Sequence, residues 1–169
     1  KGRQFELDRK YNLWSFIVCL ILFGLSFQAL YASNNRTWQL SPDALTLWLL
    51  SVVVFIIGII GFKDKSSKRA RWRSWLTILI IVPLSIAFLL GVAVNTIARE
   101  HIETTQSPDN RTTIDFYTLN GGAATSISVT GIVNGPLWIK KRIYYEVPMH
   151  EVDVEWLNNH TIKINNHTL

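Results

Sequence analysis

The chain has 169 residues, of which 49% are hydrophobic and 17% charged, and its formal net charge is +5. This length allows one membrane unit and one small domain. A single cysteine, Cys19, excludes an intrachain disulfide and any zinc site built from cysteines. The basic residues cluster beside apolar stretches, so the charge indicates membrane topology and not nucleic-acid binding.

Three apolar stretches dominate the N-terminal part. After a polar segment over 1–12, they cover about 13–32, 45–62 and 76–98, and they contain no charged residue or histidine up to residue 98. A bilayer core needs about 20 apolar residues for one helix. The sequence therefore predicts a three-helix transmembrane region over 13–98. The first stretch is longer than a typical signal-peptide core and lacks a clear cleavage site, so we expect a retained helix.

Basic residues orient these helices. Residues 1–12 and the loop 63–73 are rich in lysine and arginine, whereas the loop 33–44 has only Arg36. The positive-inside rule then predicts a multi-pass protein of the plasma membrane with a cytoplasmic N-terminus and an extracytoplasmic domain over 99–169.

The basic loop is also expected to contact lipid headgroups, because each basic residue near an anionic surface contributes about 1 kcal/mol of attraction. The candidate residues are Lys63, Lys65, Lys68, Arg69, Arg71 and Arg73.

The third apolar stretch differs from the others. Pro83 lies inside it and is expected to kink or loosen the helix. Ala87, Gly91 and Asn95 recur every four residues, so small side chains share one face and allow another helix to approach. That helix could belong to this chain or to a partner protein. The connector over 95–103 has no breaker and could continue the helix beyond the membrane.

The C-terminal part alternates polar and apolar residues at period two, which indicates half-buried antiparallel strands. Turn signals rich in Asn, Gly and Pro separate them. The expected strands are 112–119, 124–133, 137–147, 152–156 and 161–164. The fold class is thus membrane α plus a small all-β domain: three transmembrane helices followed by an extracytoplasmic antiparallel sheet or sandwich.

No motif for catalysis is recognisable, and we expect no catalytic, cofactor-binding or metal site. Four histidines lie among carboxylates in the outer domain, but His150 and Glu151 are adjacent and would point to opposite faces of a strand. No metal-ligand spacing such as HExxH occurs. The four histidines are His101, His150, His160 and His167.

Several short motifs follow one another in a particular order in the outer domain. They are Ser107-Pro108-Asp109, Leu119-Asn120-Gly121-Gly122-Ala123, Val154-Glu155-Trp156 and Thr161-Ile162-Lys163-Ile164-Asn165. Over about Gln106–Leu169 the chain resembles an uncharacterised family of small membrane-anchored proteins of Bacillus-type Gram-positive bacteria with an extracytoplasmic β domain. Asn110 and Asn166 stand where that family has turn glycines, and asparagine also tolerates left-handed turns. The resemblance implies a location but no activity.

These features favour a non-catalytic accessory or regulatory subunit of a larger membrane protein complex, whose partners are membrane lipids and a larger integral membrane protein. The alternative is an envelope-stress or immunity protein that binds a peptide or toxin at an exposed strand edge. An enzyme would require His150, His160 and nearby carboxylates to converge.

Overall fold

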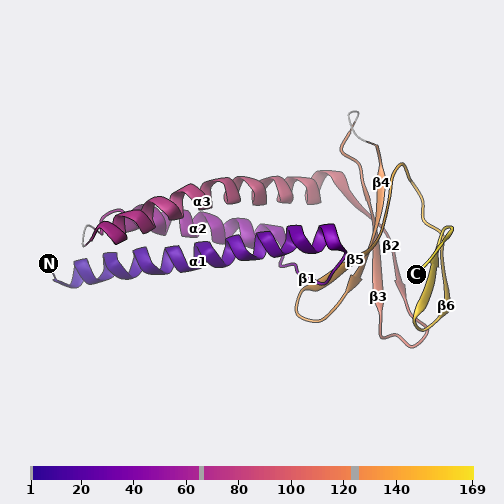
Figure 1. Ribbon diagram of the computed structural model, residues 1–169. Coiled ribbons are helices and arrows are strands. Elements are labelled where there is room, and N and C mark those ends of the chain that lie inside the picture. Colours follow the sequence, from indigo (N-terminus) through magenta and orange to yellow (C-terminus); the bar gives the residue numbers. More distant parts are fainter. Residues whose placement is uncertain (1, 65–66, 123–125) are drawn as a thin grey trace. The chain divides into compact units, whose positions relative to one another are not determined.

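The computed structural model describes residues 2–64, 67–122 and 126–169, with side chains from residue 6 onward. It contains three long helices and two antiparallel sheets (Figure 1). The chain divides into two compact units, a helical unit (residues 1–27 and 42–92) and a β unit (28–41 and 93–169).

The elements follow in chain order as α1 (Gly2–Asn35), β1 (Gln39–Leu40), α2 (Ala44–Gly61), α3 (Lys68–Ala93), a π-helical turn η1 (Val94–Ala98), β2 (Arg99–Gln106), β3 (Thr113–Leu119), β4 (Ser128–Asn134), β5 (Ile139–Glu146), β6 (Val154–Asn158), β7 (Thr161–Ile164) and β8 (His167–Thr168).

The three helices are long and apolar enough to cross a membrane, as the sequence predicted. They differ in how far their own chain covers them. Only 11% of the most apolar window of the third span is buried, against 17% for the first and 22% for the second. The third helix is therefore the least covered by its own chain.

The helices of this unit approach one another closely along a small-residue face of α2. A Cβ atom on Gly58 would lie 3.3 Å from a side-chain carbon of Thr77 in α3. One on Gly61 would lie 3.2 Å from the Cα atom of Asn12 in α1. Small residues let helix backbones pack at such short range. The packing within the chain thus uses the glycines of α2.

The basic segment expected as a loop over 63–73 is helical from Lys68 onward. Ser67 explains the early start, because its hydroxyl accepts a hydrogen bond from the backbone N–H of Ala70 at 3.1 Å and caps the helix. The helix continues through Pro83.

The predicted continuation of the third helix to Glu103 is wrong beyond Ala98. From Arg99 onward the chain forms β2, which pairs antiparallel with β3. Thr104 and Thr105 are β-branched and suit a strand. The ladder with β3 supplies backbone partners that a free helix extension would find only in water.

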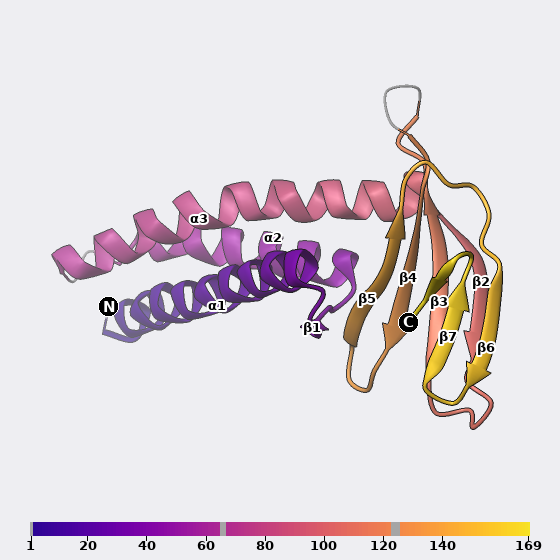
Figure 2. The ribbon, with the colours of Figure 1, turned by 45° about the vertical axis from the view of Figure 1, so that its right-hand side comes forward.

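The β unit consists of a five-stranded sheet in the order β1-β5-β4-β3-β2 and a three-stranded sheet in the order β6-β7-β8 (Figure 2). One apolar core joins the two sheets. Its buried members are Ile114, Phe116, Val129, Tyr144, Ile162 and Ile164. The alternation predicted for 112–119 and 161–164 is confirmed, since Ile114 and Phe116 share the core with Ile162 and Ile164.

Gly131 is required at the centre of this core. A Cβ atom there would lie 2.8 Å from a ring carbon of Phe116 and 3.1 Å from the Cβ atom of Tyr144. The Phe116 ring and the Cβ atom of Tyr144 thus occupy the space that the side chain of any other residue would fill.

The turns adjust the expected strand limits. Leu137 and Trp138 have φ values of 53° and 62°, so they lie in the tight turn before β5 and not in the strand. Asn110 has a φ of 57°, as expected for a residue in place of a turn glycine. At the last turn the left-handed residue is Asn165, with a φ of 51°, and not Asn166. Residues 124 and 125 of the predicted second strand lie outside the described residues.

Candidate functional site

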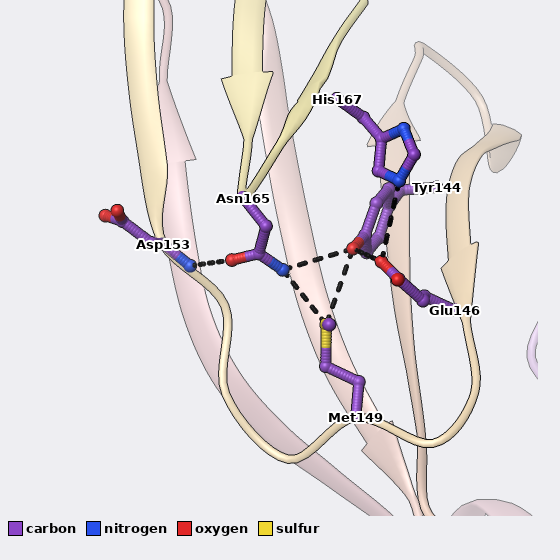
Figure 3. Close-up of polar contacts among 6 residues, drawn as sticks. All are labelled: Tyr144, Glu146, Met149, Asp153, Asn165 and His167. Atoms are coloured by element: carbon purple, nitrogen blue, oxygen red, sulfur yellow. Dashed lines mark hydrogen bonds and ion pairs between the residues drawn. The ribbon is translucent and has the colours of Figure 1, made fainter.

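A polar cluster lies at one end of the core, where the two sheets meet (Figure 3). We call it the intersheet cluster. It comprises Tyr144, Glu146, Met149, Asp153, Asn165 and His167. Its residues come from β5, from the β5–β6 connection, from the β7–β8 turn and from β8.

Asn165 organises the cluster. Its side-chain oxygen accepts a hydrogen bond from the backbone N–H of Asp153 at 2.8 Å, which fixes the orientation of the amide. Its Nδ2 then donates to the Tyr144 hydroxyl at 3.1 Å and lies 2.9 Å from the Met149 sulfur. The left-handed turn at Asn165 therefore ties the small sheet to β5.

Tyr144 accepts a hydrogen bond from Asn165 and donates one in turn. Its hydroxyl donates to the Glu146 carboxylate. Burial raises the pKa of Tyr144, and the hydrogen bond to Glu146 raises it further. The phenol thus stays protonated at neutral pH. His167 lies at the exposed rim, with its Nε2 3.9 Å from Glu146 Oε2. The cluster acts as a polar clamp between the sheets.

A second polar cluster lies on the other face of the five-stranded sheet, around Asp115 in β3. Its carboxylate accepts hydrogen bonds from Thr104 at 2.7 Å and from Asn134 at 2.5 Å. Burial opposes ionisation, but these hydrogen bonds and the charge of His101 outweigh it and hold the pKa of Asp115 below its ordinary value. The carboxylate links β2, β3 and β4.

Tyr117 extends this second cluster towards η1. The Arg99 guanidinium lies 3.6 Å from the centre of the Tyr117 ring, within range of a cation–π interaction. Burial raises the pKa of Tyr117, and the charge of Asp115 adds to the effect.

The helical unit has a polar centre of its own at Asn12. Asn12 Nδ2 lies 2.9 Å from the Ala70 carbonyl oxygen, 3.0 Å from Ser74 Oγ and 3.3 Å from the Gly61 carbonyl oxygen. Arg73 Nε donates to Asn12 Oδ1 at 3.3 Å. One buried amide thereby connects α1 with the C-terminal end of α2 and the N-terminal part of α3.

The structure places the predicted helix-docking residues as follows. Ala87 is exposed, and a Cβ atom on Gly91 would meet nothing within 4 Å. Asn95 lies in η1 and accepts a hydrogen bond from Arg99 at 3.0 Å. Ala87 and Gly91 thus lie on an open part of α3, whereas Asn95 is hydrogen-bonded to Arg99 of the β unit.

The predicted lipid-headgroup residues lie mainly on the first turns of α3. Lys63, Lys68, Arg69 and Arg71 are exposed, whereas Arg73 is half-buried beside Asn12. Lys65 lies outside the described residues. Lys68 and Arg71 also line an open groove of about 600 Å³ with Trp72, Trp75, Leu76 and Leu79.

The histidines lie in different places. His101 is in β2, His160 is in the turn before β7, and His150 and His167 are exposed near the β5–β6 connection and in β8. Among the described residues, no three His, Cys, Asp or Glu side chains are grouped as a metal ion would require.

Fold and sites together define a class: a chain of three apolar helices whose third helix leads directly into a two-sheet β domain held by a polar clamp. Residues 68–169 match DUF5412, described as a family of unknown function, and the chain belongs to this family. The match begins at the first residue of α3. No curated protein matches the chain, and no solved structure does.

Proposed function

We propose that this protein is a non-catalytic accessory or regulatory subunit of a larger protein complex in the cell membrane of a Gram-positive bacterium. Its N-terminus and the basic segment around Lys68 would face the cytoplasm, and its β domain would lie on the extracytoplasmic side. The three apolar helices and the distribution of lysine and arginine support this orientation.

The observation that carries the proposal is the open face of α3. The small residues of α2, Gly58 and Gly61, are already in contact with neighbouring helices of the chain. Ala87 and Gly91 of α3 are not covered in this way, since Ala87 is exposed and Gly91 has open space in front of it. Within the described part of the chain, the bundle has thus used one small-residue face and left the other open.

Small residues favour helix association in lipid because they let backbones approach and make extensive van der Waals contact. Ile86 and Leu90 flank the open face and are largely exposed, so they could pack beside an incoming helix. The family match also supports a role for α3, because it covers this helix together with the β domain.

Co-purification tests the proposal. The full chain, isolated from its native membrane in mild detergent, should retain a stoichiometric integral membrane partner. The G91L substitution should remove that partner by filling the open face. G24L is the matched control, because a Cβ atom on Gly24 of α1 also meets nothing within 4 Å. A chain that purifies alone, or a partner lost equally with G24L, would contradict the proposal.

A second candidate function is supported by β2. This eight-residue strand lies at an edge of the large sheet, and most of its side chains are exposed. An extended peptide or toxin segment could add to such an edge through backbone hydrogen bonds. Cells that lack the protein should then change their sensitivity to an envelope-active peptide. Unchanged sensitivity across a panel of such peptides would remove this candidate.

A further inference from the structure

A cavity of about 240 Å³ lies within the β unit, on the sheet face opposite the apolar core. Its floor is formed by side chains of β3, β4 and β5, among them Tyr117 and Thr130. The C-terminal end of α1, at Ser33, and the start of η1 complete the wall. The cavity therefore lies where the first and third apolar spans end, because these spans run to Asn35 and Ala98.

Two arginines give this cavity a positive charge. Arg99 enters from the start of β2 and Arg142 from β5. None of the described residues that line the cavity is an aspartate or a glutamate. The remaining polar lining consists of hydroxyl and amide side chains, which are neutral. The lining is thus suited to an anion.

Arg142 has unused hydrogen-bonding capacity. Its Nη2 donates to the Ser33 carbonyl oxygen at 2.6 Å, which positions the guanidinium at the cavity wall. Its Nε is buried and has no hydrogen-bond partner among the residues that the structure describes. A guanidinium offers five N–H donors in a planar fork. Because the Nε itself is closed to solvent, an oxyanion in the cavity would be bound by the terminal N–H groups that Ser33 does not engage.

Arg99 is fixed in a different way. It lies over the Tyr117 ring and donates to Asn95, so its position is set before any ligand arrives. Asp115 is the carboxylate whose charge acts on Arg99, but three side chains of the sheet already hydrogen-bond to it. Asp115 keeps its negative charge and offsets part of that of Arg99, but Arg99 and Arg142 together still leave one net positive charge beside the cavity.

The size of the cavity and the chemistry of its lining limit the kinds of ligand that it can bind. Pockets for drug-sized molecules typically measure about 300–1,000 Å³, so this smaller cavity suits a compact group. Arginine forks bind phosphate oxygens through paired, charge-assisted hydrogen bonds. Thr130 and Gln39 on the lining can donate to further oxygens. A phosphate group that carries one small substituent fits these features.

We propose that the Arg99–Arg142 cavity is a binding site for the phosphate group of a phosphate ester. A phospholipid headgroup and a soluble ester such as glycerol phosphate share this chemistry. If the helices span the membrane as proposed above, the cavity follows the ends of two spans and lies at headgroup level. The identification of the phosphate group as part of a lipid depends on that membrane orientation. The proposal that the cavity binds a phosphate group does not depend on it.

The proposal is tested on the full chain purified in a neutral detergent. Binding of short-chain phosphatidylglycerol, of phosphatidylcholine and of glycerol phosphate is measured by titration calorimetry. We expect binding of phosphatidylglycerol or glycerol phosphate, weakened about tenfold or more by R142Q and by R99Q through the loss of charge-assisted hydrogen bonds. T130M should weaken it too, because it fills the cavity without changing the charge.

R111Q is the matched control, since Arg111 is an arginine of the same domain whose side chain is 86% exposed in the β2–β3 turn. R142K retains the charge but loses the fork and should bind with intermediate affinity. Circular dichroism of each variant separates lost binding from lost folding. Binding of the lipid alone identifies a headgroup site, and binding of glycerol phosphate identifies a soluble ligand.

The proposal is overturned if folded wild-type protein binds neither phosphatidylglycerol nor glycerol phosphate, or if R111Q weakens binding as much as R142Q does. Phosphate binding is measured on the purified chain, so it does not depend on a co-purified partner. The G91L experiment tests the proposed function and the R142Q experiment tests the phosphate site, and either proposal can fail while the other stands.

Discussion

The helical unit and the β unit differ in what they bury and in what they expose. The buried positions of the β unit include Phe116, Val129 and Ile164, as expected for a domain in water. The helical unit has a small apolar cluster around Leu22 and Ile81, but it also buries Asn12 and Thr77 almost completely and exposes most of its large apolar side chains. Polar groups at helix contacts and apolar groups outside are expected when lipid surrounds a bundle. The contrast supports the proposed membrane insertion of the helices.

The largest expected effect on stability is seen by substituting one phenylalanine in each unit. Phe116 is fully buried in the β core, whereas Phe27 on α1 is 66% exposed. F116A should destabilise the β domain by about 3–5 kcal/mol, because it removes apolar contacts and leaves a cavity. F27A should have little effect. Limited proteolysis of both variants in detergent measures the difference, and equal protection would remove the contrast between the units.

The polar interior of the helices gives the next largest effect. N12A removes the hydrogen bonds from one side chain to α2 and α3 and should cost about 1–2 kcal/mol, the range of interhelical hydrogen bonds in model peptides. The control is N34A, at an exposed asparagine of α1. Thermal unfolding of the detergent-solubilised chain compares the two. A loss no greater for N12A than for N34A would show that the polar centre is not stabilising.

The intersheet cluster predicts a smaller effect on the β domain. Y144F removes a hydroxyl that bonds Glu146 and Asn165 and should cost about 1 kcal/mol. Y145F is the control, because Tyr145 follows on the same strand and is exposed. Since the pKa of Tyr144 is raised, its contribution is full below the ordinary tyrosine pKa of about 10 and is lost as the pH rises through the native value. Chemical denaturation from pH 7 to 11 tests this, and a Y144F variant with the same alkaline loss as wild type would contradict it.

Asp115 predicts the smallest effect, at acid pH. Its lowered pKa means that ionised Asp115 contributes its full stability above the ordinary value of about 4, and that this contribution is lost as the pH falls through the native value. D115N should therefore flatten the acid side of the stability curve. E103Q, at an exposed carboxylate of β2, serves as the comparison. Identical acid profiles for wild type and D115N would exclude this role.

Periodicity predicted the parts of the fold where one physical cause acts alone. Unbroken apolar stretches identified the three helices, and alternation identified the core faces of β3 and β7. The connector over 95–103 has no breaker, so its local sequence allows a continued helix, whereas the structure has a strand from Arg99 onward. The strand β2 forms because it pairs with β3, and the local sequence of β2 contains no information about that pairing.

The sites were harder to predict for the same reason. Asn12 lies just before the first charge-free stretch and reads as an ordinary polar residue, yet it contacts residues 49 to 62 positions away. Arg142 reads as a strand cation until its bond to Ser33, 109 positions earlier, is known. For Asn12, the signal in the sequence was a lone asparagine beside an apolar stretch. The small residues Ala87 and Gly91 were recognisable by spacing, and the structure adds that their face is open.

The two-residue strand β1 determines how this protein can be dissected. Gln39 and Leu40, from the connection between α1 and α2, form the outermost strand beside β5. A fragment that begins at Arg99 would lack this strand and would leave the edge of β5 bare. Bare edges invite pairing between copies. A soluble version of the domain should therefore carry residues 36–41 fused through a linker or a charged substitution at the β5 edge.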